Sequence, residues 1–562
     1  MPLAAQAPDC PDRPAGVPWR GIWPWAFSLF AGATMSLCYA PAGWGDLCWG
    51  AIAPLACAIW FSRPAARRER LRLAGLGFLF GAAYFGGSLF WLTTLTVPGW
   101  AALSLYLSAY PAAWAVFLGT VAKPQDAAEA GGRPAWLGSA GNLRACALGA
   151  AAWVALEWLR GVIFPQFPWN PAGVALGKNI PLIQISDITG VGGISFLVVM
   201  VNLMAVATVR RVMIEKNLGV RRPHYDFALT VALVALAWGY GVREMFAPAP
   251  AVTDFSFASV QANIPQSVRN DLAQESDVLA SYARHTEVAL AMRPDLLLWP
   301  ESATPRPVFN DQATWDAVRG LAEKHDGDFL LGTVHLSEGG DFNSVAMLSE
   351  HGKAAQMYHK NHLVPFGEYI PFRKAFPLFA WIVGDLVPGD FDPGPEPVVF
   401  EMSAKPVKIG PLICFEDVLG DLARQFALRG AQAFVVVTND GWFLDSAGSR
   451  QHLAHAAFRC AENKIPMVRS ANSGVTCMVD RFGMVRETLQ TEGGDTFIEG
   501  VLFGKVPAPA SPPTTFYARN GEAFSIACLL VSALAAGRAF LRSHKIKNSA
   551  CPPTSETKPL AQ

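Results

Sequence analysis

Charged residues are scarce in this sequence. Asp, Glu, Lys and Arg make up 16% of the 562 residues, whereas about 25% is usual in soluble proteins. Hydrophobic residues reach 52%. The imbalance is concentrated in residues 20–245, which are rich in Leu, Ala, Gly, Trp and Phe, while residues 250–505 have the composition of a soluble domain. The chain is also longer than one domain usually is. We therefore expect a membrane part and a soluble part.

The sequence has no excess of positive or negative charge. It also has no cysteines or histidines at the spacing of metal ligands. Its formal net charge is zero, which gives no support for nucleic-acid binding. The ten cysteines form no CxxC motif, no Cys/His cluster and no disulfide framework. The soluble part holds Cys414, Cys460 and Cys477. We expect no metal, no cofactor and no nucleic-acid partner.

Apolar runs predict about eight membrane spans, because a bilayer core about 30 Å thick needs about 20 apolar residues per helix. The first two runs are short and predict a tight hairpin, and no small-residue cleavage site follows the first, so we expect it to be retained. The expected order is an N-terminal tail (1–19), a membrane domain of about seven spans (20–245), a catalytic domain (246–505), a linker (506–521), a final span (522–541) and a C-terminal tail (542–562). The candidate spans are 22–39, 45–61, 73–95, 98–121, 144–163, 191–209, 226–243 and 522–541.

Basic residues beside the spans predict the orientation. Cytoplasmic loops are enriched in Lys and Arg, and an eight-span chain with both termini inside places all three basic clusters in the cytoplasm. Residues 245–520 then lie on the opposite side. The clusters are Arg63, Arg67, Arg68, Arg70 and Arg72; Arg210, Arg211, Lys216, Arg221 and Arg222; and Arg538, Arg542, Lys545 and Lys547.

One carboxylate falls inside a predicted span. Glu157 is costly in a membrane helix and is either a functional group or the partner of Arg160 in an interfacial salt bridge. The aromatic, proline-rich loop 164–170 that follows predicts an interfacial belt or a substrate portal.

The soluble part alternates strand-like and helix-like segments, which is typical of a layered α/β (αββα) domain. Catalytic groups in such domains lie at the C-terminal ends of strands. The predicted strands are 252–262, 295–300, 329–334, 343–348, 433–438, 466–470 and 474–480, and the predicted helices are 272–292, 312–325, 418–428 and 450–463.

Three candidate catalytic residues each end a strand-like segment: Glu301, Lys360 and Cys414. Acyl transfer through a thiol needs a base near the sulfur and donors for the oxyanion. Glu301 can act as base and then acid, and Lys360 can stabilise the oxyanion and favour thiolate. Each residue alone is more often a core thiol or a surface charge. The ordered set favours catalysis, because burying these charges at strand ends is otherwise costly.

Three further residues complete the candidate site. The backbone N–H of Phe415, next to the nucleophile, is a second oxyanion donor, and Glu368 and Glu416 can orient Lys360 and Glu301.

These motifs resemble the carbon–nitrogen hydrolase (nitrilase) superfamily, and the longer stretches resemble its membrane branch, the apolipoprotein N-acyltransferases. The resemblance covers residues 20–541, and the motif from His359 to Pro371 is highly specific to this branch. The matching stretches are 261–266 (QANIPQ), 299–302 (WPES), 359–371 (HKNHLVPFGEYIP), 414–416 (CFE), 438–443 (TNDGWF), 469–476 (RSANSGVT) and 515–521 (TFYARNG).

The resemblance implies a mechanism and a location. The family moves an acyl chain from a phospholipid to a cysteine as a thioester, then to the α-amino group of a lipoprotein's diacylglyceryl-cysteine. It implies Glu301 as base, Lys360 as oxyanion stabiliser and Cys414 as nucleophile in a ping-pong reaction on the periplasmic side of the bacterial inner membrane, with Glu368 and Glu416 as supporting carboxylates. We expect a monomer.

Two positions depart from the family pattern. Phe415 stands where a tyrosine is common, which removes any role for a phenolic hydroxyl, and Asn270 stands where a tryptophan is frequent, which affects lipid docking. Two alternatives stay open: a membrane-bound carbon–nitrogen hydrolase (amidase), which needs the same three residues, and a membrane scaffold with an inactive nitrilase-like domain.

Overall fold

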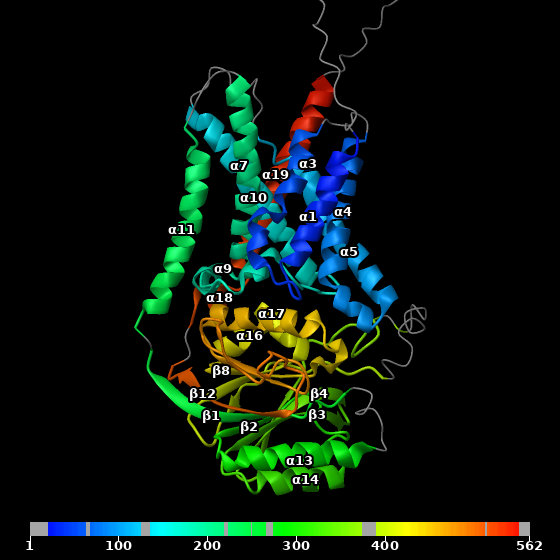
Figure 1. Cartoon of the computed structure of the whole chain (residues 1–562), viewed down its shortest axis with the longest axis vertical. Coiled ribbons are helices and arrows are strands. Elements are labelled where there is room, and N and C mark those ends of the chain that lie inside the picture. Colours follow the sequence, from blue (N-terminus) through cyan, green and yellow to red (C-terminus); the bar gives the residue numbers. More distant parts are fainter. Residues whose placement is uncertain are drawn as a thin grey trace, which may run out of the picture.

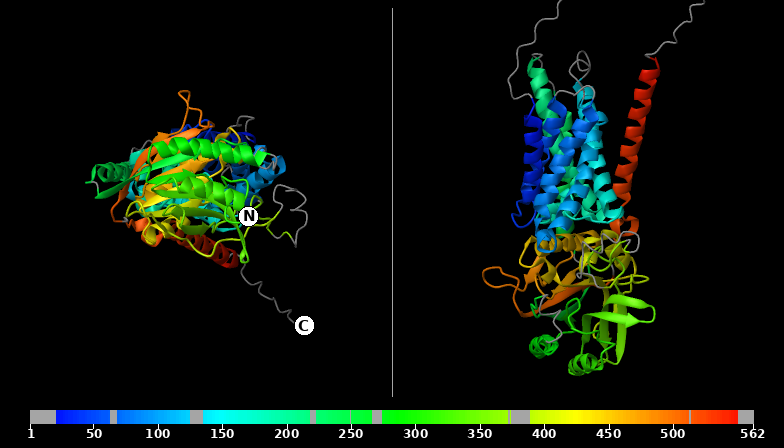
Figure 2. Two further views of the ribbon diagram at one scale, coloured as in Figure 1. Left: turned by 90° about the horizontal axis from the view of Figure 1, so that it is seen from below. Right: turned by 90° about the vertical axis from the view of Figure 1, so that its right-hand side faces the viewer.

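The computed structural model describes residues 21–62, 68–124, 135–217, 223–248, 250–265, 274–371, 373, 389–511 and 514–549. A helical bundle stands on an α/β sandwich; the first described helix begins, and the last one ends, on the side of the bundle away from the sandwich (Figures 1 and 2). The predicted tail 1–19 and Asn270 lie outside the described residues.

Helices occupy all eight predicted spans. Five are long and apolar enough to cross a membrane: 97–120, 138–162, 191–216, 225–246 and 523–542. The first two runs form shorter helices, and the third helix begins with charged residues and ends at Ser88, before the predicted end at residue 95. The helices are α1 (Trp23–Leu37), η1 (Gly45–Leu47), α2 (Cys48–Ala51), α3 (Ala53–Phe61), α4 (Glu69–Ser88), η2 (Phe90–Thr94), α5 (Val97–Thr120), α7 (Ala135–Val162), α10 (Val191–Asn217), α11 (Tyr225–Phe246) and α19 (Ala523–Ser549), with η3 (Ala172–Leu176), α8 (Ile180–Ile183) and α9 (Ser186–Thr189) between α7 and α10.

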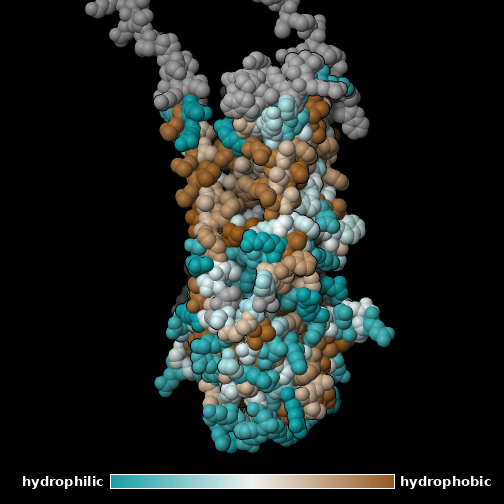
Figure 3. Space-filling view, turned by 90° about the vertical axis from the view of Figure 1, so that its left-hand side faces the viewer, coloured by the Kyte–Doolittle hydropathy of each residue, from teal (hydrophilic) through white to brown (hydrophobic). Residues whose placement is uncertain are grey.

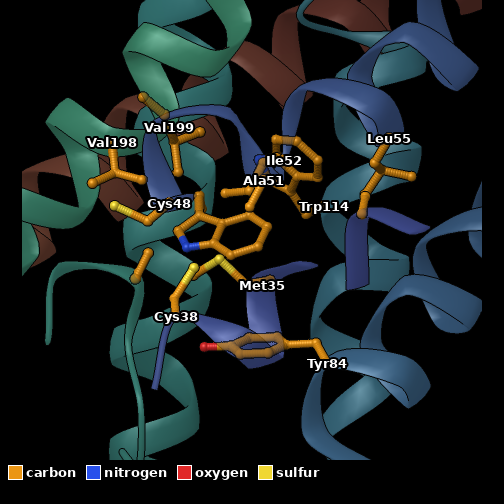
Figure 4. Packing of buried hydrophobic residues seen from close by; sticks show 14 of the residues in the cluster. Met35, Cys38, Cys48, Ala51, Ile52, Leu55, Tyr84, Trp114, Val198 and Val199 are labelled. Atoms are coloured by element: carbon orange, nitrogen blue, oxygen red, sulfur yellow. The ribbon is translucent and has the colours of Figure 1, made fainter. Parts of the chain in front are cut away.

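Small residues let these helices pack closely. A Cβ on Gly81 of α4 would lie 2.7 Å from Cα of Ser108 on α5, so a larger residue does not fit there. Met35, Trp114 and Val198, from three different helices, meet in the centre of the bundle (Figure 4). On the face that Figure 3 shows, apolar residues cover the bundle and hydrophilic residues cover the sandwich, which is the distribution expected of a membrane domain carrying a water-exposed domain.

The soluble part is the predicted αββα sandwich. Its two six-stranded sheets have the orders β12-β1-β2-β3-β4-β5 and β11-β10-β9-β8-β7-β6. Helices α13 (Glu275–Ala291) and α14 (Gln312–Ala322) lie on the outer side of the first sheet, and α16 (Gly420–Leu428) and α17 (Ala447–Asn463) lie between the second sheet and the bundle (Figure 1). The strands are β1 (Val252–Gln261), β2 (Leu296–Trp299), β3 (Asp328–Ser337), β4 (Gly340–Ser349), β5 (Ala354–His359), β6 (Phe400–Glu401), β7 (Lys408–Ile413), β8 (Ala433–Thr438), β9 (Met467–Ala471), β10 (Cys477–Val479), β11 (Val485–Thr488) and β12 (Gly500–Pro509).

Strand β12 was not predicted, and it changes one boundary. All ten of its residues pair antiparallel with β1, from Gly500 opposite Gln261 to Pro509 opposite Val252. The strand therefore continues past the predicted domain end at residue 505, and the predicted linker 506–521 begins inside it and also contains helix α18 (Phe516–Asn520). Glycine and proline are depleted in strands, so the glycines and prolines of residues 500–509 did not predict a strand. Proline is tolerated here because β12 lies at the edge of its sheet.

Candidate active site

The candidate nucleophile lies on a strained turn. Strand β7 ends at Ile413, and Cys414 starts the short helix η6 (Cys414–Val418) with φ +51°. This left-handed conformation is costly for a residue other than glycine. It is tied on both sides, because the N–H of Ile413 donates to Oε2 of Glu416 at 2.9 Å and the Cys414 carbonyl oxygen lies 3.2 Å from Nε2 of His452. A strained strand-to-helix turn of this kind presents a nucleophile at the edge of a sheet.

Glu301 and Lys360 form a buried pair beside this turn. Glu301 follows β2 and Lys360 follows β5, and Nζ of Lys360 lies 3.8 Å from Oε1 of Glu301 and 2.8 Å from Oε1 of Glu368. Lys360 is only 1% exposed. Burial alone lowers the pKa of Lys360, but the charges of Glu368 and Glu301 outweigh it and raise that pKa above its ordinary value. Lys360 is therefore a fixed cation.

The charges of Glu301 and Lys360 both act on the pKa of the Cys414 thiol. Burial and the negative charge of Glu301 raise the pKa of Cys414, and Lys360 opposes that rise only in part. A side-chain hydrogen bond links Cys414 to Thr438 at the end of β8. The thiol is therefore protonated at neutral pH, so a base must take its proton as it attacks.

Asn343 links the two carboxylates that flank Lys360. Its Nδ2 donates to Oε1 of Glu301 at 2.8 Å and to Oε1 of Glu368 at 2.7 Å, and its backbone oxygen accepts the N–H of Lys360 at 2.8 Å. The backbone N–H of Asn439 donates to Oε2 of Glu301 at 2.9 Å. Both oxygens of Glu301 are thus held in place.

Glu416 ties the two chain segments of the site together. Its oxygens accept the Tyr358 hydroxyl at 2.8 Å, the N–H of Asn361 at 2.8 Å, the N–H of His362 at 3.1 Å and the N–H of Ile413 at 2.9 Å. Burial raises the pKa of Glu416 to about 7. The charge of Lys360 and the hydrogen bonds from these donors favour the carboxylate and oppose that rise in pKa. Glu416 therefore positions the chain on both sides of Lys360 and the turn at Cys414.

Four buried charged side chains form a cluster beside the turn at Cys414: Asp417, Asp440, His452 and Arg469. Nε2 of His452 lies 2.6 Å from Oδ1 of Asp417, and its Nδ1 lies 3.2 Å from Oδ1 of Asp440. Nη1 of Arg469 donates to Oδ2 of Asp440 at 3.0 Å. Arg469 and a protonated His452 balance the two aspartates, so the cluster is neutral, as buried charges require.

Residues of the membrane domain close over the site. The Phe415 ring lies parallel to Trp169 and Phe167, with centroids 6.1 and 6.2 Å apart. Gln451 of α17, in the next turn to His455, accepts the indole N–H of Trp169 at 2.8 Å. Burial lowers the pKa of His455, so it is neutral, and its Nε2 accepts the N–H of Asn170 at 3.0 Å. The 164–170 loop therefore joins the bundle to the turn that carries Cys414.

The salt bridge considered for Glu157 does not form in the described part of the chain. Oε1 of Glu157 instead accepts the indole N–H of Trp153 and the backbone N–H of Ala172, both at 2.7 Å. No nitrogen of Arg160 lies within 4.0 Å of this carboxylate in the described residues.

The structure brings the predicted residues Glu301, Lys360, Cys414, Glu368 and Glu416 together, and the side chain of Phe415 faces the membrane domain. Their catalytic roles stay predictions. Sequence reasoning gave no role to Asn343, Tyr358, Asn439 or His452. Two signals were available: Asn439 lies in the matching stretch 438–443, and Asn343 is a polar residue at the start of the predicted strand 343–348.

Two family models match the two parts of the chain. A family model described as the apolipoprotein N-acyltransferase N-terminal domain matches residues 31–204, and the carbon–nitrogen hydrolase model matches residues 256–505. A CN-hydrolase superfamily protein from Xanthomonas campestris, 19% identical, aligns over 46% of this chain and 92% of its own, with a TM-score of 0.35.

Two relatives match nearly the whole chain. The apolipoprotein N-acyltransferase of Geobacter metallireducens is 31% identical over 535 residues, covering 92% of this chain and 95% of the relative. That of Rhodopseudomonas palustris is 30% identical over 528 residues, covering 89% and 92%. With both parts matched in order and at this coverage, the chain belongs to the apolipoprotein N-acyltransferase family.

Proposed function

We propose that the protein moves a fatty acyl chain from a membrane phospholipid, through a thioester on Cys414, to the α-amino group of a diacylglyceryl-cysteine lipoprotein. One observation carries this proposal: a strained cysteine turn beside a buried Glu–Lys pair lies directly under a membrane bundle and is capped by its aromatic residues. Such a placement lets a bilayer lipid meet a thiol without leaving the membrane.

In the first half-reaction Glu301 takes the proton of the Cys414 thiol as the sulfur attacks the ester carbonyl carbon of the phospholipid. The C–O bond breaks, and Glu301 returns the proton to the departing lysophospholipid oxygen. Lys360 and the backbone N–H of Phe415 stabilise the oxyanion. The raised pKa of Cys414 supports a base that acts during attack, since the resting thiol holds its proton.

In the second half-reaction the lipoprotein amine attacks the thioester carbon, and Glu301 takes a proton from the nitrogen. The C–S bond breaks, the amide forms and the thiolate regains the proton, so the enzyme returns to its starting state. We propose that the monomer suffices for this reaction, because one chain supplies all of the proposed catalytic and supporting side chains: Glu301, Lys360, Glu368, Cys414 and Glu416.

The location we propose is the bacterial inner membrane, with the catalytic domain on the periplasmic side. The described basic residues support this orientation: Arg70 and Arg72 begin α4, Arg210 and Arg211 lie toward the end of α10, and Arg538 and Arg542 lie toward the end of α19. These helix ends are the ones farthest from the sandwich (Figure 1), and cytoplasmic ends carry the basic residues.

Intact-mass measurement tests the proposal. Purified protein mixed with phospholipid alone should gain one acyl mass on Cys414, and a diacylated lipopeptide should then remove it as a triacylated product. Cys414→Ala should gain no mass, whereas Cys460→Ala, which removes a buried thiol from α17, should behave as the unmodified protein. Release of free fatty acid without triacylated product would identify a hydrolase, and mass gain in Cys414→Ala would remove Cys414 from its role.

A further inference from the structure

Arg160 is a buried cation whose guanidinium group is only partly satisfied by the residues that the structure describes. It is 2% exposed, and its Nε and Nη2 have no hydrogen-bond partner in the described structure. Its guanidinium carbon lies 5.1 Å from the centre of the Phe85 ring. Burying a guanidinium without an acceptor is unfavourable, and a well-placed anion offsets that cost. The side chain is therefore built to meet an acceptor from outside the chain.

A pocket lies at this guanidinium, between α4, α5 and α7. Its walls are aromatic and apolar apart from Glu157 and Arg160, and they include Tyr84, Phe85, Tyr110, Trp114 and Trp153. Tyr84 and Trp114 point into the centre of the bundle in Figure 4. The carboxylate of Glu157 is held on the other side by Trp153 and Ala172, which leaves the guanidinium N–H groups for another acceptor.

The pocket lies at the end of the bundle next to the catalytic domain. Arg160 is in the last turn of α7, and its carbonyl oxygen accepts the N–H of Phe167 at 3.1 Å. Phe167 stacks on Phe415, the residue after the nucleophile. The charge of Arg160 also reaches α17, where burial, Arg459, His452 and Arg160 lower the pKa of His455.

We propose that Arg160 binds the phosphodiester of the phospholipid acyl donor and thereby positions its ester beside Cys414. The guanidinium fork fits two phosphate oxygens, and this end of the bundle is at headgroup depth in the orientation proposed above. This inference rests on the proposed function and adds to it the group that recognises the donor.

Lipid binding by the full-length Cys414→Ala protein, which cannot turn over, tests the site directly. Native mass spectrometry in detergent should show retention of phosphatidylglycerol that falls at least tenfold in Cys414→Ala/Arg160→Gln. Retention of diacylglycerol with the same chains should not change. Arg144→Gln, which removes an exposed arginine from the same helix, should keep both lipids. Equal retention of phosphatidylglycerol with and without Arg160, or equal loss of both lipids, would overturn the inference.

A second variant and a competition measurement extend this test. Arg160→Lys keeps the charge but not the fork, so phosphatidylglycerol retention should be intermediate; it serves as the test if Arg160→Gln does not fold. Inorganic phosphate at millimolar concentration should not displace the lipid. Displacement by inorganic phosphate would identify a free-anion site and refute a lipid site.

Acylation separates this inference from the proposed function. If Cys414 gains an acyl group at the same rate and the same apparent KM in Arg160→Gln, the phosphate site is refuted while acyl transfer stands. If binding depends on Arg160 but the unmodified protein never gains an acyl group, the phosphate site stands and the proposed function fails.

Discussion

Among single residues, Asn343 shows how the site keeps two carboxylates close together. One amide nitrogen donates to both Glu301 and Glu368, and Lys360 supplies the only cation within 4.0 Å of either in the described structure. Removing that donor leaves the carboxylates to repel each other across a buried space, where like charges interact strongly.

We predict that Asn343→Asp lowers the rate of Cys414 acylation by a factor of about 100 or more, because a third carboxylate misplaces Glu301 and Lys360. The rate is measured by quenched-flow intact mass with phospholipid. Asn310→Asp makes the same chemical change on an exposed loop of the same domain and should leave the rate unchanged. A normal rate in Asn343→Asp would show that this amide does not hold the site.

The residues proposed to carry the chemistry were easier to predict than the residues that position them. Glu301, Lys360 and Cys414 each follow an apolar strand, and the sequence shows this without any knowledge of neighbours. Tyr358 gains its importance from Glu416, 58 positions away, and His452 gains its importance from contacts 12 to 38 positions away. No local pattern contains such a contact.

Among the elements, α17 joins the two parts of the molecule, and Gln451 is the α17 side chain that bonds several segments of the bundle at once. The side-chain amide of Gln451 is buried, and both its oxygen and its nitrogen form hydrogen bonds. Its oxygen accepts from Trp91 Nε1 at 3.0 Å, Trp169 Nε1 at 2.8 Å and Asn170 Nδ2 at 3.0 Å, and its nitrogen donates to the carbonyl oxygens of Ala40 at 2.6 Å and Ser88 at 2.9 Å.

We predict that Gln451→Ala lowers the free energy of unfolding by about 3 kcal/mol or more, because it leaves several buried polar groups without partners, each costing about 1–3 kcal/mol. The measurement is thermal unfolding of the purified protein in detergent. Gln425→Ala on α16, whose side chain donates to Asp421 of its own helix, should unfold as the unmodified protein does. An unchanged unfolding temperature in Gln451→Ala would argue against α17 as the joint.

Elements with a strong period were predictable, and elements defined by pairing were not. The amphipathic helices α13, α14 and α16 and the apolar strands β2 and β8 lie within a few residues of their predicted positions. Strand β12 contains two glycines and two prolines and becomes a strand only because β1 pairs with it along its whole length. Pairing partners far apart in sequence leave no trace in a local pattern.

For the whole molecule, hydropathy and charge predicted the two-part architecture, and they also predict its orientation in the membrane. In intact cells with a permeable outer membrane, a membrane-impermeant maleimide should label Ser337→Cys, which is exposed at the β3–β4 turn. Lys216→Cys, at the end of α10, should react only after lysis. The reverse pattern would contradict the proposed orientation.

Global stability should also depend on pH through the buried cluster under Cys414. Burial and Arg469 disfavour a charged His452, but the carboxylates of Asp417 and Asp440 prevail and raise its pKa to about 9. An unfolded histidine has a pKa of about 6.5. A raised pKa stabilises the fold below the unfolded value, and this contribution is lost as pH rises toward the folded value.

We therefore predict that the free energy of unfolding falls by roughly 3 kcal/mol between about pH 6.5 and 9 because of His452 alone. Burial also raises the pKa of Glu416 to about 7 and that of Glu462 to about 8, so their stabilising contributions fall with rising pH as well, but from about pH 4.3 upward and largely below this range. The difference between the unmodified protein and His452→Asn, followed by thermal unfolding across this range, isolates the histidine. His325→Asn is the matched control, because burial lowers the pKa of His325, so its contribution to stability changes only below about pH 6.5 and not across this range. If the two variants lose stability with pH in parallel, His452 does not carry the charge that balances the cluster.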